Sequence, residues 1–411
     1  MASPPSRPVP FDPLSPDFAH DPYPTYAALR ARQRLQYYEP YDMWLVPRYR
    51  EVDRILRSPA MVRTLDDLSP DQVEKRRRAD NWHEMPHHQR FVQFSLLDSD
   101  GPVHERLRGL VAGAFTPRAI AHLEGSTTTH TRELFDSAAD REIDFVEDVA
   151  AHIPGRVIGA LFGVPSEDSS KLRRWSDDIV QFFDLDRSDE RKRLAENTTK
   201  QFYRYLLDVA TERRRAPRDD LMSELTALWD AGQLTEDEFV STCMLIVMAG
   251  HGSTVDVISS GMHSLLRFPE QLQRLRHDRS LLPTAVQEMF RFEPPLPFFH
   301  RYCTENVEIA GQQFAPGTRF GLLYGSANRD AEIFDDPDRF DVGRRPNPHK
   351  AFGGGAHFCL GIHLARLTMT VFFGELIERF ASVELLDPAP TYKPGLSVRG
   401  PRHLHVRCIS A

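Results

Sequence analysis

The sequence is poor in cysteine, and none of its cysteines are paired at a metal-binding spacing. Only four occur in 411 residues, namely Cys243, Cys303, Cys359 and Cys408, and no two of them form a CxxC pair. This separation excludes a zinc knuckle, an iron–sulfur cluster and a disulfide-stapled scaffold. No GxGxxG motif follows a predicted strand, so no flavin site is indicated either. We therefore expect a protein of a reducing, cytoplasmic compartment.

The chain also lacks an excess of positive charge and a long apolar run. It has 51 basic and 59 acidic residues, a formal net charge of -8, whereas binding to nucleic acid requires a concentrated basic surface. The longest strongly apolar stretch, Cys243 to Ala249, is far shorter than the about 20 residues that cross a bilayer. We expect neither a nucleic-acid partner nor a membrane segment, and interpret the six prolines within residues 1–16 as an extended N-terminal strap.

Helical patterns dominate the rest of the chain. A capping box of Thr235 and Glu238 begins an apolar helix of about thirty residues that should end before Pro269. Residues 35–46 are predicted to form a hairpin, and residues 294–355 are rich in proline, glycine and aspartate. No internal repeat or Gly/Ser linker divides residues 17–411. We predict one domain there, mainly α with small β-sheets.

One cysteine stands in a glycine-rich run. Residues 352–361 read FGGGAHFCLG, and Cys359 directly precedes a helical pattern over Leu360 to Phe380. Glycines permit backbone angles that a Cβ forbids, and the N–H groups at a helix N-terminus stabilise a thiolate. Such a loop can present one thiolate to a haem iron. The alternative is a buried free cysteine after a flexible loop.

The run resembles the ligand loop of the cytochrome P450 superfamily, Phe-Gly-x-Gly-x-His/Arg-x-Cys-x-Gly, at every fixed position. The resemblance implies the cytochrome P450 fold, with a long central helix over a heme b group (iron protoporphyrin IX). It makes Cys359 the axial ligand of the iron. Phe352 would pack over its sulfur and exclude water.

Four basic side chains match places where the family binds the haem propionates. Residues 100–108 resemble the family's Asp-x-Pro-x-His-x-x-x-Arg, which implies contacts from His104 and Arg108. Arg301 and His357 occupy two further such places. Because propionates in a dry cleft need cationic or hydrogen-bonding partners, all four are predicted to bind the cofactor.

A buried ion cluster is predicted near the cysteine loop. Glu288 and Arg291 are three residues apart on an apolar helical segment and can pair. The resemblance adds Arg339, from Pro337-Asp338-Arg339-Phe340, as a third member. We expect this cluster to fix the loop that leads to Cys359.

The central helix carries AGHGST at residues 249–254, which resembles the family's Ala/Gly-Gly-x-Asp/Glu-Thr-Thr/Ser. Ala249 and Gly250 would leave room for the haem and dioxygen, and the Ser253 hydroxyl would relay protons. The acid of the pattern is replaced by Gly252. Protons would then come from water, from His251 or from the substrate. Alternatively, Ser253 caps a helix carbonyl and Gly252 marks a kink.

Mostly apolar residues are predicted to line a substrate pocket. They are Leu245, Met248, Ala249, Pro297, Phe298, Leu396 and Ser397.

The function predicted from this resemblance is a monomeric haem-thiolate monooxygenase acting on a mostly hydrophobic small molecule. Electrons would come from a ferredoxin and its reductase, docking near the Cys359 side with Arg106, Lys350 and Arg366 as candidate contacts. The missing acid at Gly252 motivates an alternative, a haem-thiolate enzyme driven by peroxide or carrying out radical coupling. A second alternative is a catalytically silent haem-binding module that recruits partners.

Overall fold

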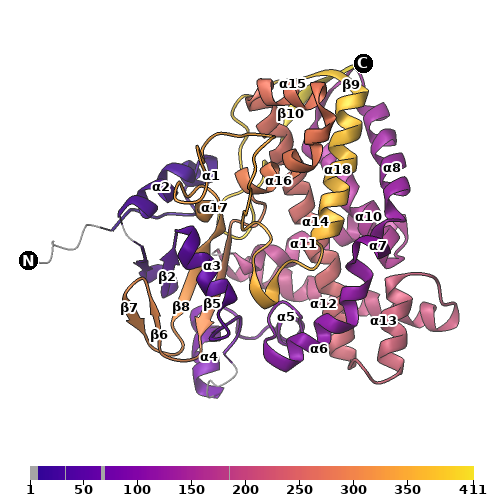
Figure 1. The fold of residues 1–411 in the computed structure, drawn as a ribbon. Helices are drawn as coiled ribbons and strands as arrows, with labels where there is room; N and C mark the ends of the chain where they lie inside the picture. The colour runs from indigo at the N-terminus through magenta and orange to yellow at the C-terminus, as the bar shows by residue number, and fades with distance from the viewer. Residues whose placement is uncertain (1–7, 33, 66–69, 185) are drawn as a thin grey trace, which may run out of the picture. The chain divides into compact units, whose positions relative to one another are not determined.

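The computed structural model describes residues 8–32, 34–65, 70–184 and 186–411 (Figure 1). The chain forms two compact units, each assembled from three segments. The first unit comprises Met1–Leu65, Ser259–Cys359 and Asp387–His403, and the second comprises Asp66–Ile258, Leu360–Leu386 and Leu404–Ala411. Part of the predicted strap, residues 1–7, lies outside the described residues. A single domain for residues 17–411 stays a prediction.

The first unit is built around a five-stranded sheet in the order β1-β2-β8-β5-β3. Its strands are β1 Gln36–Tyr38, β2 Met43–Val46, β8 Arg319–Leu323, β5 Phe298–Cys303 and β3 Met61–Val62. The β1–β2 pair confirms the predicted hairpin, and β2 and β8 run parallel. Val46, Ile55 and Phe320 belong to a buried apolar cluster at this sheet. The sheet therefore forms the core from which β5 extends.

The remaining elements of the first unit are short. They are α1 Pro16–His20, α2 Tyr23–Arg32, α3 Tyr49–Arg57, α15 Pro269–His277, α16 Leu282–Phe292, α17 Tyr324–Ala327, and the two-stranded sheet of β6 Val307–Ile309 and β7 Gln312–Phe314. The turn between β6 and β7 places Ala310 and Gly311 at positive φ angles, 53° and 79°, as a two-residue hairpin turn requires.

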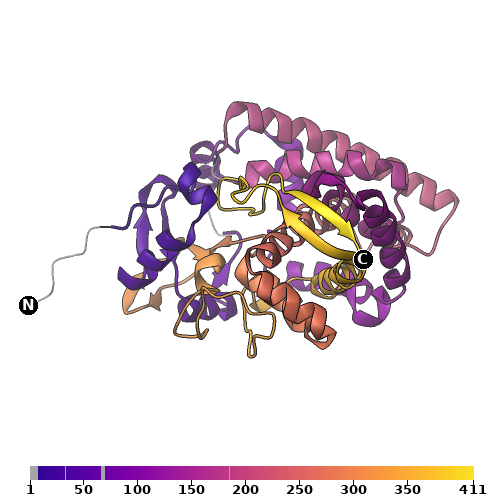
Figure 2. The same cartoon turned by 90° about the horizontal axis from the view of Figure 1, so that it is seen from above.

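The second unit is mainly helical. Its helices are α4 Pro70–Ala79, α5 Pro86–Gln93, α6 Gly101–Val111, α7 Pro117–Ile120, α8 Leu123–Ala138, α9 Phe145–Asp148, α10 Ile153–Phe162, α11 Ser169–Val180, α12 Asp189–Arg215, α13 Leu221–Asp230 and α18 Ile362–Arg379. A sheet of β4 Glu142–Asp144, β10 His405–Ser410 and β9 Phe380–Leu385 completes the unit. The long antiparallel strands β9 and β10 lie side by side in Figure 2.

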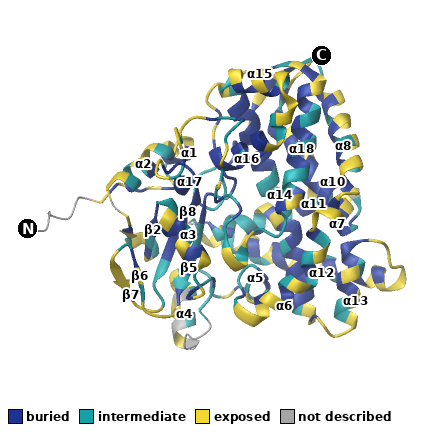
Figure 3. Cartoon of the chain, in the orientation of Figure 1, coloured by how far each residue is buried: buried dark blue, intermediate teal, exposed yellow. Residues whose placement is uncertain are grey.

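Helix α8 illustrates how these helices bury one face. Its buried residues Leu123, Thr127, Thr131 and Phe135 recur every fourth position, so they form one stripe while the rest of the helix is more exposed (Figure 3). The short 3-10 segments of the chain are η1 Glu39–Tyr41, η2 Ala112–Phe115, η3 Ala150–His152, η4 Ser166–Asp168, η5 Gln181–Phe183, η6 Arg279–Leu281 and η7 Gly355–His357.

The longest helix, α14, spans Glu236–Arg267, and its 32 residues confirm the predicted long helix. The capping box forms as expected. The N–H of Thr235 donates to Glu238 Oε2 at 2.9 Å, and the N–H of Glu238 donates to Thr235 Oγ1 at 3.2 Å. Among the described residues α14 alone has the length and apolar composition of a membrane span, and 72% of its apolar window is buried in the fold. A buried core helix has the same composition.

Candidate functional site

The loop before Cys359 is shaped by glycine. Gly355 has φ of 66°, and a Cβ built on it would lie 1.9 Å from the carbonyl oxygen of Leu56. No other residue type fits this close approach. The segment η7 follows, and the N–H of Cys359 donates to the Phe352 carbonyl at 3.0 Å, which closes the loop. Helix α18 begins at Ile362, two residues later than the sequence pattern suggested.

Cys359 differs from the other three cysteines in exposure. It is partly exposed, whereas Cys243, Cys303 and Cys408 are buried. Burial raises the pKa of Cys243, and it raises the pKa of the Cys408 thiol, in strand β10, to about 11. A thiol that is hard to ionise is a poor metal ligand. Cys359 is therefore the cysteine best suited to offer an accessible thiolate.

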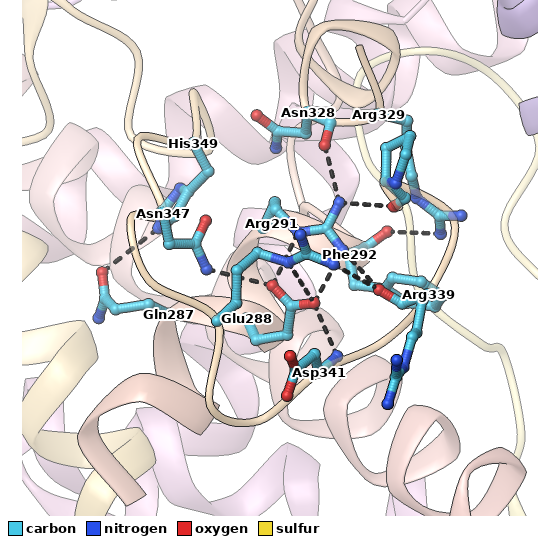
Figure 4. Close-up of polar contacts among 12 residues, drawn as sticks. Gln287, Glu288, Arg291, Phe292, Asn328, Arg329, Arg339, Asp341, Asn347 and His349 are labelled. Carbon is cyan, nitrogen blue, oxygen red and sulfur yellow. Dashed lines mark hydrogen bonds and ion pairs between the residues drawn. The ribbon is translucent and has the colours of Figure 1, made fainter. Parts of the chain in front are cut away.

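A buried ion cluster lies on α16, and Figure 4 shows its polar contacts. Arg291 donates to both carboxylate oxygens of Glu288, at 2.7 and 2.8 Å, and neither side chain is exposed. The same guanidinium donates to the backbone carbonyls of Asn328, Pro337 and Arg339 at 2.7 to 3.0 Å. The predicted Glu288–Arg291 pair is confirmed. Each guanidinium nitrogen of the buried Arg291 donates to a carboxylate or carbonyl oxygen.

The prediction that the Arg339 side chain joins the ion cluster was wrong. Arg339 contributes its backbone carbonyl to Arg291, and the second guanidinium on Glu288 comes from Arg344, whose Nε lies 3.1 Å from Oε1. The N–H of Asp341 and the side-chain amide of Asn347 also donate to Glu288, at 2.9 and 3.1 Å. Arg344 and Asn347 lie in an irregular loop, where no helical or strand period indicates which side chains turn inward.

This cluster is connected to the cysteine loop through packing in the same unit. The Phe352 ring lies 4.5 Å from that of Phe290 on α16, centroid to centroid. The N–H of Lys350 donates to Asn328 Oδ1 at 2.6 Å. Helix α16 therefore holds the loop before Cys359 through two contacts. Arg291 binds Asn328, which in turn binds Lys350, and Phe290 packs against Phe352.

Two of the predicted docking residues are engaged within the fold. Lys350 is 5% exposed and forms an ion pair with Asp53, so it cannot be a surface contact for a partner. Arg106 is exposed, and it pairs with Glu238. The expectation for Lys350 was therefore wrong.

Two buried guanidiniums converge beside β5. Arg301 and Arg63 are each 4% exposed, and both donate through Nη1 to the His300 carbonyl, at 2.8 and 3.0 Å. Such concentrated buried positive charge favours an anionic group. Arg301 was predicted from the sequence, but Arg63 was missed because its segment carries no motif. His357, also predicted, lies partly exposed on η7 in the same unit.

The other two predicted propionate contacts lie on α6 in the second unit. His104 and Arg108 are one helical turn apart on the same face, as the spacing predicted. His104 is 3% exposed and Arg108 is partly buried.

Helix α14 carries an accessible stripe near its middle. Leu245, Ala249 and Ser253 follow each other at four-residue intervals and are partly or fully exposed, while Ile246, Val247 and Met248 are buried. Met248, also predicted for the pocket, is 6% exposed, and its role there stays a prediction. Ser253 Oγ donates to the Ala249 carbonyl at 2.8 Å, so its hydroxyl caps a helix carbonyl, and the helix continues without a break.

Gly250 and His251 face away from this stripe. A Cβ on Gly250 would lie 2.4 Å from Ile158 Cδ1 of α10, so helix packing rather than haem contact requires a small residue there. His251 is 2% exposed, and its ring lies beside Gly155 of α10. Burial, with a smaller contribution from Arg173, lowers the pKa of His251 to about 4. His251 is therefore neutral at neutral pH and is not a ready proton source.

The predicted substrate residues of the first unit lie at the start of β5 and in residues 396–397. Pro297 and Phe298 are buried, Leu396 is fully buried, and Ser397 is partly exposed. A second buried ion pair holds the segment that follows Ser397. Arg399 Nε lies 2.8 Å from Glu293 Oε2, and both side chains are nearly unexposed.

Tyr23 and Arg329 complete this second cluster. The Tyr23 hydroxyl donates to Glu293 at 3.0 Å, and Arg329 lies 3.8 Å from the same carboxylate. The two arginines offset the burial of Glu293 and hold its pKa below the usual range. The Leu396–Arg399 turn is thereby fixed to the end of α16.

Comparisons with known proteins agree with this arrangement. The family model described as "Cytochrome P450" matches residues 68–405. The "Biotin biosynthesis cytochrome P450" of Bacillus subtilis (strain 168) is 35% identical over 398 residues, covering 95% of this chain and 97% of that protein. "Nocardicin C N-oxygenase" of Nocardia uniformis subsp. tsuyamanensis is 35% identical, covering 98% of both chains. The solved structure of P450BioI with an acyl carrier protein carrying hexadec-9Z-enoic acid has a TM-score of 0.86 at 33% identity, covering 95% of this chain and 99% of that one.

Proposed function

Because this chain belongs to the cytochrome P450 family, we propose that it is a monooxygenase acting on a mostly hydrophobic small organic molecule, with electrons from an external ferredoxin and its reductase. The balanced reaction consumes the substrate C–H bond, O2, two electrons and two protons, and yields the hydroxylated product and water. The enzyme is a bacterial-type P450 with heme b and a cysteine thiolate ligand. A cytoplasmic location follows from the same proposal.

We assign the thiolate to Cys359. It alone among the four cysteines is partly exposed, and it follows a loop that Gly355 and the Cys359–Phe352 hydrogen bond hold in shape. Cys408 is near the C-terminus but is buried in strand β10. When bound, the haem supplies the activation of O2, which a thiolate ligand promotes by donating electron density.

The remaining residues bind and orient. In the first unit, Arg63, Arg301 and His357 are the groups we assign to the propionates, and the burial of the two guanidiniums makes a carboxylate a favourable partner. For His104 and Arg108 of α6, the assignment rests on the motif at residues 100–108. The accessible stripe of α14 presents Ala249 and Leu245 as an apolar wall, and Ser253 as the hydroxyl that moves protons.

The substrate class rests on this lining. Apolar side chains on the α14 stripe and the buried Phe298 and Leu396 favour a hydrophobic molecule. Relatives at the same level of identity carry names as different as a biotin biosynthesis P450 and a nocardicin C N-oxygenase. The family alone therefore does not select one substrate.

The accessible Cys359 is the observation that carries the proposal, and a spectrum tests it. We expect the reduced, CO-bound holoprotein to show the red-shifted Soret band of a thiolate-ligated haem. Cys359→Ser should abolish that band completely, because a hydroxyl does not ionise to replace the thiolate. The matched control is Cys408→Ser, which should retain it. Loss of the band in the Cys408 variant alone would overturn the assignment.

The absence of an acid at Gly252 favours a second candidate, in which hydrogen peroxide replaces O2 and external electrons. Peroxide already carries the two electrons and two protons that O2 lacks. Product formation should be compared with peroxide and with NADPH plus a ferredoxin system, using a substrate selected by its spin-state shift of the ferric protein. Turnover that depends on peroxide alone would replace the first proposal with the second.

A further inference from the structure

The position where the family pattern has an acid faces a carboxylate from another helix. A Cβ built on Gly252 would meet one atom within 4 Å outside its own helix neighbours, Asp177 Oδ1 of α11 at 3.8 Å. Both residues lie in the second unit. A Cβ therefore fits at Gly252 at ordinary contact distance, and the atom it would meet is a carboxylate oxygen.

The surroundings of Asp177 suit a group that exchanges protons with solvent. Its side chain is 54% exposed, and its Oδ2 lies 3.8 Å from Arg173 Nε. Arg173 in turn donates to both carboxylate oxygens of Glu147, at 2.9 and 3.1 Å. Arg173 thus holds Glu147 closely, while the more exposed Asp177 lies farther from its guanidinium.

Other acids and bases near this position are less suited to the task. Asp256 lies one turn beyond Gly252 on the same face of α14, but it is 1% exposed and so has little exchange with solvent. His251 is buried and turned toward α10. Glu147 is engaged on the opposite side of Arg173. Asp178, the neighbour of Asp177, accepts a hydrogen bond from Thr198 of α12 at 3.1 Å.

We propose that Asp177 replaces the acid missing at position 252, by carrying protons from solvent to water beside Gly252 and from there to Ser253. The inference rests on the proposed function and concerns the same site. Asp177 accepts a proton from bulk water and releases it to the water beside Gly252. The single hydroxyl proton of Ser253 is donated to the Ala249 carbonyl at 2.8 Å. To pass that proton on, the hydroxyl turns away from the carbonyl, and its oxygen accepts the next proton from the water beside Gly252. Two such transfers supply the two protons of the balanced reaction, and no electron moves through Asp177.

Asp177 acts through water and Ser253, so it is a proton-supplying residue rather than a catalytic one. The first experiment measures its position without turnover. In the diamagnetic, CO-bound ferrous holoprotein, 13C NMR of labelled aspartate gives the pKa of the Asp177 carboxyl, assigned by its loss in Asp177→Asn. Gly252→Asp should raise that pKa by about one pH unit, because two carboxylates would share the space. Gly252→Ala should leave it unchanged. An unmoved Asp177 pKa in Gly252→Asp would overturn the proposal.

The second experiment measures where electrons go. With a ferredoxin system and hexadec-9Z-enoic acid as the probe, the hydrogen peroxide released per electron pair is compared among variants. Asp177→Asn should raise that fraction at least about threefold, because slow proton delivery diverts electrons to peroxide. The neighbouring Asp178→Asn should match the unmodified protein, and Gly252→Asp in the Asp177→Asn background should restore the low peroxide fraction.

The outcomes separate this inference from the proposed function. Unchanged peroxide release in Asp177→Asn, with the thiolate Soret band intact, would refute the role of Asp177 and leave the monooxygenase proposal standing. An unmodified protein that shows no such band, or consumes no electrons, would refute both.

Discussion

The cysteine loop and the middle of α14 are held in opposite ways. Around the loop, Glu288 and Arg291 are wholly buried and each makes several hydrogen bonds. Beside Gly252, Asp177 is 54% exposed and Arg173 is partly exposed, and their charged atoms are 3.8 Å apart. A metal ligand must be held in one place, whereas protons need only a path. The difference indicates that a tightly bonded scaffold can be identified from a motif, but a proton path must be located in the structure.

The largest expected effect comes from a substitution in the buried ion cluster beside the cysteine loop. Glu288→Gln keeps the shape of the side chain but leaves the buried charge of Arg291 without its carboxylate. We expect the free energy of unfolding to fall by about 3–5 kcal/mol, measured by urea denaturation of the holoprotein at pH 7. The control is Arg339→Ala, which removes a side chain that makes no contact with Glu288 and should cost less than about 0.5 kcal/mol. Equal losses in the two variants would show that Arg339 belongs to the ion cluster after all.

The ion cluster also shows which contacts can be predicted from the sequence. The pair Glu288 and Arg291 follows from helical spacing in an apolar segment, and the hairpin, the long helix and the glycine-rich loop each have a local signature. Arg344 and Asn347 could not be predicted, because they reach Glu288 from an irregular loop that has no period. Arg63 was missed for a related reason. It directly follows β3, and the two residues of that strand are too few to show a strand period.

The next prediction concerns two glycines that are neighbours on α14 and differ in what they face. Gly250→Ala should lower the free energy of unfolding by about 1–3 kcal/mol, because its Cβ must displace Ile158. The second substitution Ile158→Ala should reduce that penalty, with the remaining cost set by the space it leaves. Gly252→Ala should cost nothing or stabilise by up to about 1 kcal/mol, since alanine favours the helix and no atom lies closer than 3.8 Å.

The motif at residues 249–254 contained both glycines, and the sequence assigned Gly250 to the haem side and Gly252 to a missing acid or a kink. The sequence indicates which residues are small but not which neighbour requires it, because that neighbour comes from α10 or α11, about 75 to 95 residues earlier in the chain. A penalty at Gly252 as large as that at Gly250 would contradict the open space beside it.

The smallest expected effect tests whether His251 belongs to the proton path. Its pKa is lowered from 6.5 to about 4 in the folded protein, chiefly by burial. Between these two values the unfolded chain binds more protons than the folded one, so stability is present in full above pH 6.5 and is lost as the pH falls toward 4. From pH 7 to 5.5 this loss is about 1 kcal/mol for one such group. His88 and His263 are buried with lowered pKa values of about 3 and 4 and add to the same trend.

The contribution of His251 to this pH dependence is therefore obtained only by comparing a His251 variant with the unmodified protein. His251→Gln should lose about 1 kcal/mol less than the unmodified protein between pH 7 and pH 5.5, measured by urea denaturation at both values. Parallel losses would mean that the imidazole already carries its proton in the folded protein. His251 would then regain its place as a proton source beside Gly252, and the need for a carboxylate from α11 would diminish. A neutral, structural His251 leaves the exposed carboxylate of Asp177 as the better connection between solvent and Ser253.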